Sequence, residues 1–570
     1  MIIIVLAVIA SDKPHPWSET SRAPATEYDC GKNCIKISRM EEMRSNRLRL
    51  WKDPLFWVAF SCAGFIIALT LWFGIGVDNS VFGYCSWVWQ HYGLPPYVGC
   101  MECDYPGIFL ITRFAMLFGE NALSLRVLDV CAQLSVLVMI FYLAKRLSGL
   151  GMSGLLACLF YATYYYSLDF QMTAQREAFI LWLSLIATVV SLVMKRRVFA
   201  RAVLAGLLLG FIFLLKPTYG LFWPLFGLWF LLEGFGKGLG ILAAELGVFS
   251  LCCLAPAGVI ILLYWHWGYL PDLFALTIDY TFHVYVKLPI FAEKSGVLYT
   301  TDNIRVIPYL LKQFLGFYVP ALTGAVIFFA RVPVFRDPKQ KKLLRVIVGL
   351  IVLSLVSAYL QLGVYLYHHI VIWGYLMILC GCGWAGALKL IKGANSSFPR
   401  QAVCWALLAM VLALMFLHVP GYLRSFAVNY SFRSLDRAYE TQYSLPMETA
   451  RYLQTVMRPS DQVYYFGNIS MIPFLLKKKL GAPFPFTIQL HLRTADGDLK
   501  TEQLNWKKRY IDGFLELKPR FFIFDANCLF CPGGDLRGVL KGDFPGLQAA
   551  LDKNYHLAKS FGAVEIYEMN

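Results

Sequence analysis

Long apolar runs, separated by short polar segments, dominate the first three-quarters of the chain. Several of these runs approach or exceed the ~20 residues that a helix needs to cross a bilayer. The pattern therefore predicts a polytopic helical membrane protein. The expected spans, eleven in all, lie near residues 55–77, 121–144, 150–167, 177–194, 200–215, 218–236, 238–264, 306–330, 343–363, 370–391 and 401–420.

From residue 421 onward the pattern becomes that of a water-soluble domain. Residues 447–457 have the spacing of an amphipathic helix. Residues 462–467 and 520–525 are predicted to be short buried strands, because they are apolar and bounded by turn residues. The alternating run 562–568 predicts an edge strand. Residues 421–570 are therefore expected to form a small α/β domain.

Composition supports this division of the chain. Of the 570 residues, 58% are hydrophobic and only 15% are charged. A soluble domain carries about 25% charged residues, so this chain has too little polar surface to cover a globule in water. The formal net charge of +16 is interpreted first as a signal of topology and of contact with anionic lipids, and not of nucleic-acid binding.

The basic residues between the spans set the orientation. Clusters at 44–52, 145–146, 195–201, 331–345 and 389–400 all fall on one side when the N-terminus is placed inside, as the positive-inside rule requires. The C-terminus is then outside. The ionisable residues that fall at the external face in this topology are Asp78, Asp104, Asp169, Arg176, Lys216 and His368/His369.

The first external loop is acidic and aromatic. The stretch from Gly76 to Gly107 contains Asp78, Glu102 and Asp104 but no lysine or arginine. Its aromatic residues and prolines predict short helices that lie on the membrane surface and return Asp104 to the level of Asp78. An ionisable group at the mouth of a span is costly, which makes these acids candidate functional residues. The simpler alternative is that Asp78 only marks the membrane interface.

The order and sidedness of these features resemble a known family. Asp78 follows the first span, and Asp104-Tyr-Pro-Gly-Ile-Phe precedes an amphipathic stretch from Arg113 to Val127. This arrangement resembles the GT-C glycosyltransferases, and among them the bacterial group akin to protein O-mannosyltransferases and lipid A aminoarabinose transferases. The resemblance implies a GT-C-like fold and transfer of a sugar from a polyprenyl-phosphate carrier at the outer face of the membrane.

The resemblance also implies roles for the acids of the first loop. Asp78 matches the family's first-loop aspartate, which implies the general base that takes the proton of the acceptor hydroxyl. Asp104 matches the acidic position before the proline of the loop and implies a second catalytic carboxylate, with Glu102 in support. The aminoarabinose transferases have lysine before that proline, where this chain has Tyr105. Cations for the phosphate must then come from elsewhere.

Two helix ends supply candidate cations for the carrier phosphate. Lys216 resembles the lysine at the equivalent helix end of the family, and Arg176 has the guanidinium geometry that suits a bidentate phosphate contact. The alternative for each is snorkelling to lipid head groups. Glu177 is expected to pair with Arg176 and hold it in place.

A tyrosine- and histidine-rich segment, residues 365–369, resembles the part of the family that reaches the carrier phosphate. It makes Tyr367, His368 and His369 further candidates for phosphate binding. Tyrosine and histidine are also common at membrane interfaces, and that alternative stays open.

The domain organisation follows from these assignments. Residues 1–54 are expected to be a disordered cytosolic segment, and residues 55–420 a transmembrane catalytic domain with external loops 78–120 and 265–305. The resemblance implies that the second loop closes over the lipid donor. Residues 421–570 form the external α/β domain.

Two CxxC pairs, Cys100/Cys103 and Cys528/Cys531, fall on the external side of this topology. Disulfides are favoured in an oxidising compartment. A zinc ion shared by the four thiolates is the alternative. The pairing does not follow from the sequence.

The function predicted is therefore that of an inverting membrane glycosyltransferase, which moves a hexose or pentose from a polyprenyl phosphate to a hydroxyl of a glycan, lipid or protein. The alternatives are a ligase or polymerase of lipid-linked glycans and a transporter of lipids or sugars. Transporters usually show internal repeats and helices broken near the midplane. Here no repeat is detected, the charged residues gather at one face, and a soluble domain follows on that same face.

Expectations for ligands and location complete the prediction. No cofactor is required and no metal site is assigned, although two acids near a phosphate could hold a divalent metal. Membrane lipids are expected partners and nucleic acid is not. The resemblance places the protein in a bacterial inner membrane, with its site on the periplasmic face.

Overall fold

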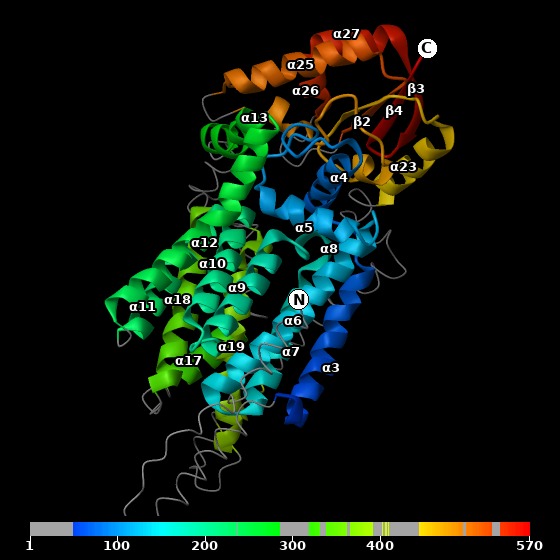
Figure 1. Cartoon of the computed structure of the whole chain (residues 1–570). Helices are drawn as coiled ribbons and strands as arrows, with labels where there is room; N and C mark the ends of the chain where they lie inside the picture. The colour runs from blue at the N-terminus through cyan, green and yellow to red at the C-terminus, as the bar shows by residue number, and fades with distance from the viewer. Residues whose placement is uncertain are drawn as a thin grey trace, which may run out of the picture.

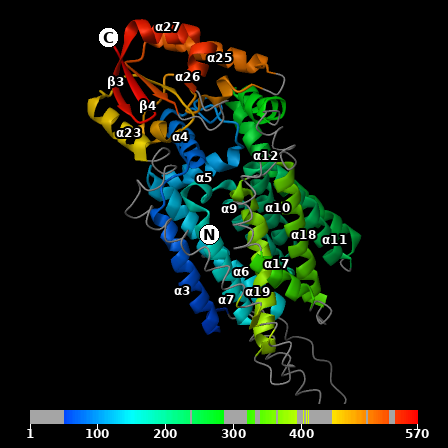
Figure 2. The same ribbon diagram turned by 180° about the vertical axis from the view of Figure 1, so that it is seen from behind.

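The computed structural model is a bundle of long helices that carries a small α/β unit beyond one end (Figures 1 and 2). We call this the sheet end of the bundle. The structure describes residues 50–235, 238–285, 319–330, 338–361, 365–391, 444–493, 497–526 and 536–570, with isolated positions between 402 and 409. Nearly all of the predicted N-terminal segment 1–54 lies outside these residues.

Within the described residues, seven helices are long and apolar enough to cross a membrane. They confirm the prediction of a polytopic helical protein. The count of eleven spans stays a prediction, because 306–330 and 401–420 lie partly or almost wholly outside the described residues. The seven are α3 with η3 (Pro54–Trp72), α6 (Ala122–Ser148), α9 (Arg176–Val193), α10 (Val198–Leu215), α12 (Leu239–His266), α18 (Pro338–Leu360), and η10 followed by α19 (Leu366–Lys389, with α19 itself Ile370–Ile391).

Three of the other predicted spans correspond to shorter helices: α7 (Gly151–Ser167), α11 (Phe222–Gly234) and α17 (Val319–Phe329). α11 follows the 3-10 turn η4 (Pro217–Leu221). At 1.5 Å per residue α11 is about 20 Å long, which is shorter than the ~30 Å hydrocarbon core of a bilayer.

Glycines allow two helices of the bundle to approach closely. Gly206 and Gly210 lie one turn apart on α10 and face α12. A Cβ at Gly206 would lie 2.7 Å from the carbonyl oxygen of Phe249, and one at Gly210 would lie 2.8 Å from the ring of Pro256. Small residues at this spacing let two backbones approach in a membrane, where packing rather than hydrophobicity drives association.

A buried ion cluster lies at the end of the bundle opposite the sheet. Arg201 near the start of α10 pairs with Glu233 of α11 and with Glu245 of α12. The side chains of Arg201 and Glu245 are both fully buried. Lys195 and Lys342 each lie 3.0 Å from Glu233. Because a buried charge is stable only when paired, this cluster fixes the positions of four helices.

The first loop contains two short helices, as predicted: α4 (Val77–Tyr92) and α5 (Pro106–Met116). A disulfide joins Cys85 of α4 to Cys100. Cys100 is therefore not paired with Cys103, which is a free thiol, and Cys100 has no thiolate to offer to a shared zinc ion. The second CxxC pair lies outside the described residues.

The C-terminal region contains a four-stranded sheet of order β1-β2-β4-β3. β1 and β2 are parallel and fully buried, as the two apolar runs predicted. The alternating run was predicted to be an edge strand, and this was wrong: β4 lies between β2 and β3. Alternation reports which face of a strand is packed and does not report whether its backbone is paired on both sides. The elements of this region are α23 (Leu445–Val456), β1 (Val463–Phe466), α24 (Met471–Leu476), η13 (Thr487–Leu490), α25 (Thr501–Leu517), β2 (Phe521–Asp525), α26 (Leu536–Asp543), α27 (Pro545–Asn554), β3 (Tyr555–Phe561) and β4 (Val564–Met569).

The sheet region is seated directly on α4 (Figure 1). The hydroxyls of Ser80 and Ser470 lie 2.8 Å apart, and the hydroxyl of Tyr84 accepts a hydrogen bond from the amide of Leu480 at 2.9 Å. Gly83 packs against the ring of Phe474. The helix that begins beside Asp78 is therefore held by the last quarter of the chain.

Candidate functional site

Five of the predicted residues meet at the sheet end of the bundle. Asp78 lies in the first turn of α4, and Asp104 lies just before α5. Arg176 and Glu177 open α9. Lys216 directly follows α10, which ends there because Pro217 disfavours the helical conformation of the residue before it. The termini of four helices thus bring together residues that are up to 138 positions apart in the sequence.

Two ion pairs organise this cluster. Arg176 pairs with Asp104, and Lys216 pairs with Glu177, whose side chain is fully buried. The prediction that Glu177 holds Arg176 was therefore wrong. Adjacent residues of a helix point in directions about 100° apart, so Glu177 faces α10 while Arg176 faces the first loop.

Asp78 has a different environment from the other carboxylates. Its Oδ2 accepts a hydrogen bond from the side-chain amide of Gln175 at 3.3 Å. Burial raises the pKa of Asp78, while the positive charge of Arg176 and the Gln175 hydrogen bond act against that rise. A carboxylate with a raised pKa is a stronger base than usual, which suits proton abstraction.

Glu102 lies close enough to Asp78 and Arg176 to interact with both charges. Its Oε1 accepts hydrogen bonds from the backbone amide of Cys103 at 2.9 Å and from the Cys103 thiol at 3.4 Å. Burial raises the pKa of Glu102 to about 7. Glu102 therefore belongs to the same charged cluster as the two aspartates, as the sequence predicted.

Tyr105 connects the first loop to the segment after α12. Its hydroxyl donates to the carbonyl of Thr277 at 3.2 Å, in the π-helical turn η5 (Ala275–Tyr280). Its neighbour Asp104 is fixed through its backbone, since the hydroxyl of Tyr97 donates to the Asp104 carbonyl at 2.6 Å. Tyr105 thus supplies a structural hydrogen bond, and not a cation, at the position before the proline of the loop.

The aromatic segment reaches the cluster from α19. η10 (Leu366–His369) places Tyr367 and His368 in buried positions. Tyr367 interacts electrostatically with Asp78 and Arg176, and His368 interacts with Lys216 and Arg176. His369 ends the same turn and interacts with His368.

Sequence reasoning missed two features of the site. Gln175 directly precedes Arg176, but its contact with Asp78 joins two segments that only the fold brings together. Arg126 and Asp129 of α6 are both buried, and a charged pair inside an apolar run is the signal that would have found them.

No group of three possible metal ligands is found among the described residues.

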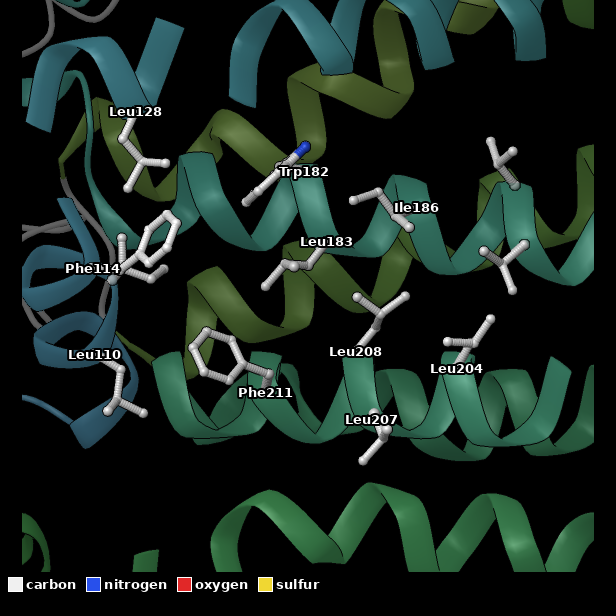
Figure 3. A pocket seen from close by; sticks show the side chains of 13 residues that line it. Leu110, Phe114, Leu128, Trp182, Leu183, Ile186, Leu204, Leu207, Leu208 and Phe211 are labelled. Atoms are coloured by element: carbon white, nitrogen blue, oxygen red, sulfur yellow. The ribbon is translucent and has the colours of Figure 1, made fainter. Parts of the chain in front are cut away.

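An apolar groove of about 550 Å³ opens below the site (Figure 3). The end of the groove nearest the sheet is formed by α5 and α6, at the left of Figure 3, and its walls are formed by α9 and α10. This end lies beside α5, and Asp104 stands just before that helix. The residues that line it are Leu110, Ile111, Phe114, Leu128, Trp182, Leu183, Ile186, Val189, Val190, Leu204, Leu207, Leu208 and Phe211.

Comparison with known families gives a match to part of the chain. The model of the dolichyl-phosphate-mannose-protein mannosyltransferase family matches residues 106–265. Over these residues, the chain resembles that family. The match begins just after Asp104 and includes Arg176, Glu177 and Lys216. It confirms the resemblance predicted from the sequence and supports a membrane glycosyltransferase.

Solved structures with a related arrangement of the chain include ArnT from Cupriavidus metallidurans bound to undecaprenyl phosphate, with a TM-score of 0.48, 12% identity and coverage of 90% of this chain and 98% of that chain. The apo state of the same protein matches with a TM-score of 0.44 and 14% identity, and the match covers 88% of this chain and 96% of that chain. The Archaeoglobus fulgidus oligosaccharyltransferase, in complex with Zn and sulfate, matches with a TM-score of 0.46 and 11% identity, and the match covers 90% of this chain and 73% of that chain. None of the curated proteins matches the chain in sequence.

Proposed function

We propose that this protein is an inverting glycosyltransferase that moves a sugar from a polyprenyl-phosphate carrier to a hydroxyl acceptor at the outer face of a bacterial inner membrane. The observation that carries the proposal is the cluster itself. One carboxylate with a raised pKa, Asp78, lies beside two cations, Arg176 and Lys216, at the membrane end of an α/β region. The family match over residues 106–265 supports the same class of reaction.

The residues divide the chemistry between them. Asp78 takes the proton from the acceptor hydroxyl as its oxygen attacks the anomeric carbon. The bond from that carbon to the phosphate oxygen breaks on the opposite face of the sugar, which inverts the configuration. Arg176 and Lys216 stabilise the negative charge that grows on the leaving phosphate. Asp104 and Glu177 hold these cations in place before the donor arrives.

The apolar groove supports a lipid-linked donor. α9 begins at Arg176, and Leu183 and Val190 lie on the same face of that helix at the next two heptad steps. A phosphate bound at Arg176 would therefore have an apolar path beneath it that leads into the membrane. We propose that the isoprenoid chain of the donor follows this path.

The proposal is tested by transfer from a panel of radiolabelled polyprenyl-phosphate sugars to membrane extracts from the host. Product with one sugar and one class of acceptor would establish the transferase and identify both substrates. Movement of label across the membrane without a product would replace the transferase with a transporter. Product that forms only when the panel is extended to polyprenyl-pyrophosphate-linked oligosaccharides would favour the ligase.

Lys216 predicts how donor affinity depends on pH. Burial lowers the pKa of Lys216 to about 8, so the free protein loses this charge above that pH. A phosphate binds the charged form, and its affinity is expected to fall about tenfold between pH 7 and pH 9. Undecaprenyl phosphate is the probe, because its phosphate is already doubly charged over that range.

The control for this experiment is Lys216→Arg, since arginine keeps its charge at every pH used. Its affinity for undecaprenyl phosphate is expected to stay level between pH 7 and pH 9. A slope that persists in this variant would show that another group, and not Lys216, titrates with the phosphate.

A further inference from the structure

One buried arginine beneath the site joins the two loops that carry the candidate residues. Arg126 lies near the start of α6 and is 1% exposed. Its Nε donates to the carbonyl of Gly74 at 3.0 Å, its Nη2 to that of Phe170 at 2.8 Å, and its Nη1 to the hydroxyl of Thr173 at 2.7 Å. All three nitrogens of the guanidinium group are therefore bound to the two connecting loops that precede α4 and α9, the second of which includes the short helix α8 (Asp169–Met172).

The two loops lead directly to the reacting groups. Gly74 stands four residues before Asp78, and Thr173 stands three before Arg176. The carbonyl of Thr173 also accepts a hydrogen bond from the side chain of Asn79 at 3.1 Å. The loop that ends at the base and the loop that ends at the phosphate cation thus meet at Arg126 and Thr173.

The surrounding backbone leaves little freedom at this junction. A Cβ at Gly76 would lie 3.0 Å from the Cα of Gln171. Ala174 has a φ of +58°, a conformation that a residue with a side chain adopts only when its surroundings enforce it. Its amide donates to the hydroxyl of Tyr165 at 2.9 Å, and that hydroxyl donates to Asp129 at 2.7 Å. Asp129 lies one turn after Arg126 on α6.

We propose that Arg126 is a positioning residue, which sets the distance between Asp78 and Arg176 by holding the two loops together. This inference rests on the proposed function, because it assigns Arg126 a task in that reaction. Lysine cannot replace it: an ammonium group is a compact point charge, whereas the planar guanidinium reaches three acceptors in fixed directions. Misplacing a reacting group by 1 Å can cost about 100-fold in rate.

The expected result for Arg126→Lys is a fall of about 100-fold in the transfer rate at saturating donor. Affinity for undecaprenyl phosphate is expected to stay within about threefold, because Asp104 and Glu177 still hold the two cations. Thr173→Val removes one of the three contacts and is expected to cost roughly tenfold. Thr173→Ser keeps the hydroxyl and is expected to restore the rate.

The pH profile separates positioning from loss of folded protein. When the loops separate, Gln175 and Arg176 move away from Asp78 and no longer oppose the effect of its burial, so the acid limb of the rate is expected to move to higher pH. A variant that merely folds poorly loses amplitude without such a shift. The charged and titratable groups that face Asp78 are Arg176, Glu177, Lys216, Glu102, Tyr285, Tyr365 and Tyr367.

The matched control is Arg146→Lys, the same substitution at the other end of α6, where the guanidinium contacts the hydroxyl and the ring of Tyr142 one turn earlier on the same helix. Wild-type rates and an unshifted profile in Arg126→Lys and Thr173→Val, with transfer lost in Asp78→Asn, would overturn the positioning role and leave the proposed function standing. Equal transfer by the wild type and Asp78→Asn would remove both.

Discussion

Asp78→Asn is expected to lower the rate of sugar transfer by about 10²- to 10⁴-fold, the range that a general base contributes. The amide has nearly the same shape and can keep a hydrogen bond to Gln175, but it cannot take the proton of the acceptor hydroxyl. Affinity for the donor is expected to change little, because the phosphate cations Arg176 and Lys216 are untouched. Transfer at saturating donor is the measurement.

The pH dependence gives a second readout for the same residue. The base acts only when it is deprotonated, and burial raises the pKa of Asp78 above its ordinary value. The rate of the wild type is therefore expected to rise with pH through that raised pKa and to be lost on acidification at a higher pH than an exposed aspartate would show. The residual rate of Asp78→Asn is expected to lack this acid limb.

A matched control for this substitution is Asp512→Asn. Asp512 is an exposed residue of α25, outside the candidate site and outside both external loops. The chemical change is identical, and the transfer rate is expected to stay at the wild-type level. An Asp78→Asn protein that folds, binds donor and transfers sugar at the wild-type rate would contradict the assignment of the base.

Arg201→Leu is expected to lower the free energy of unfolding by roughly 3–5 kcal/mol, because it breaks a buried ion pair and removes the guanidinium that balances a buried carboxylate. Glu245 is fully buried and forms a salt bridge with Arg201. Glu233 also loses Arg201 but keeps Lys195 and Lys342, each at 3.0 Å. Thermal unfolding of the protein in detergent micelles is the measurement.

The double variant Arg201→Leu/Glu245→Leu tests the cause. Replacing both members of a buried pair with apolar residues is often neutral or stabilising, so most of the lost stability is expected to return. Lys195→Gln is the surface control, since exposed pairs contribute about 0–1 kcal/mol. A single Arg201→Leu variant as stable as the wild type would show that Arg201 does not compensate the buried charge of Glu245.

Local pattern was sufficient for many elements of the fold, although it did not predict β3 or the helices α25, α26 and α27. The helices of the bundle could be predicted because a span's apolar character is a property of consecutive residues. The strands β1 and β2 could be predicted for the same reason, as buried runs between turn residues. The place of β4 inside the sheet could not be predicted. It depends on pairing with both β2 and β3, and the sequence of β4 alone does not show which strands it pairs with.

The candidate site shows the same division. The positive-inside rule placed Asp78, Arg176 and Lys216 at one face. In the structure the three residues lie close enough for the charges of Arg176 and Lys216 to act on Asp78. The partners of these residues could not be predicted, since Lys216 reaches Glu177 across 39 positions and Arg176 reaches Asp104 across 72. Such pairs follow from how helices pack, and single-sequence patterns carry little information about packing.

The seating of the sheet on α4 has a consequence for biosynthesis. Ser470 donates to the carbonyl of Val77 at 3.2 Å, and the amide of Met101 donates to Pro483 at 2.6 Å. Both sides of the first loop therefore rest on residues that leave the ribosome only after every helix of the bundle has been made. The acidic loop is assembled early but acquires its final support last, so a nascent chain held in the membrane has an incomplete site until its C-terminal region has been delivered to the same side.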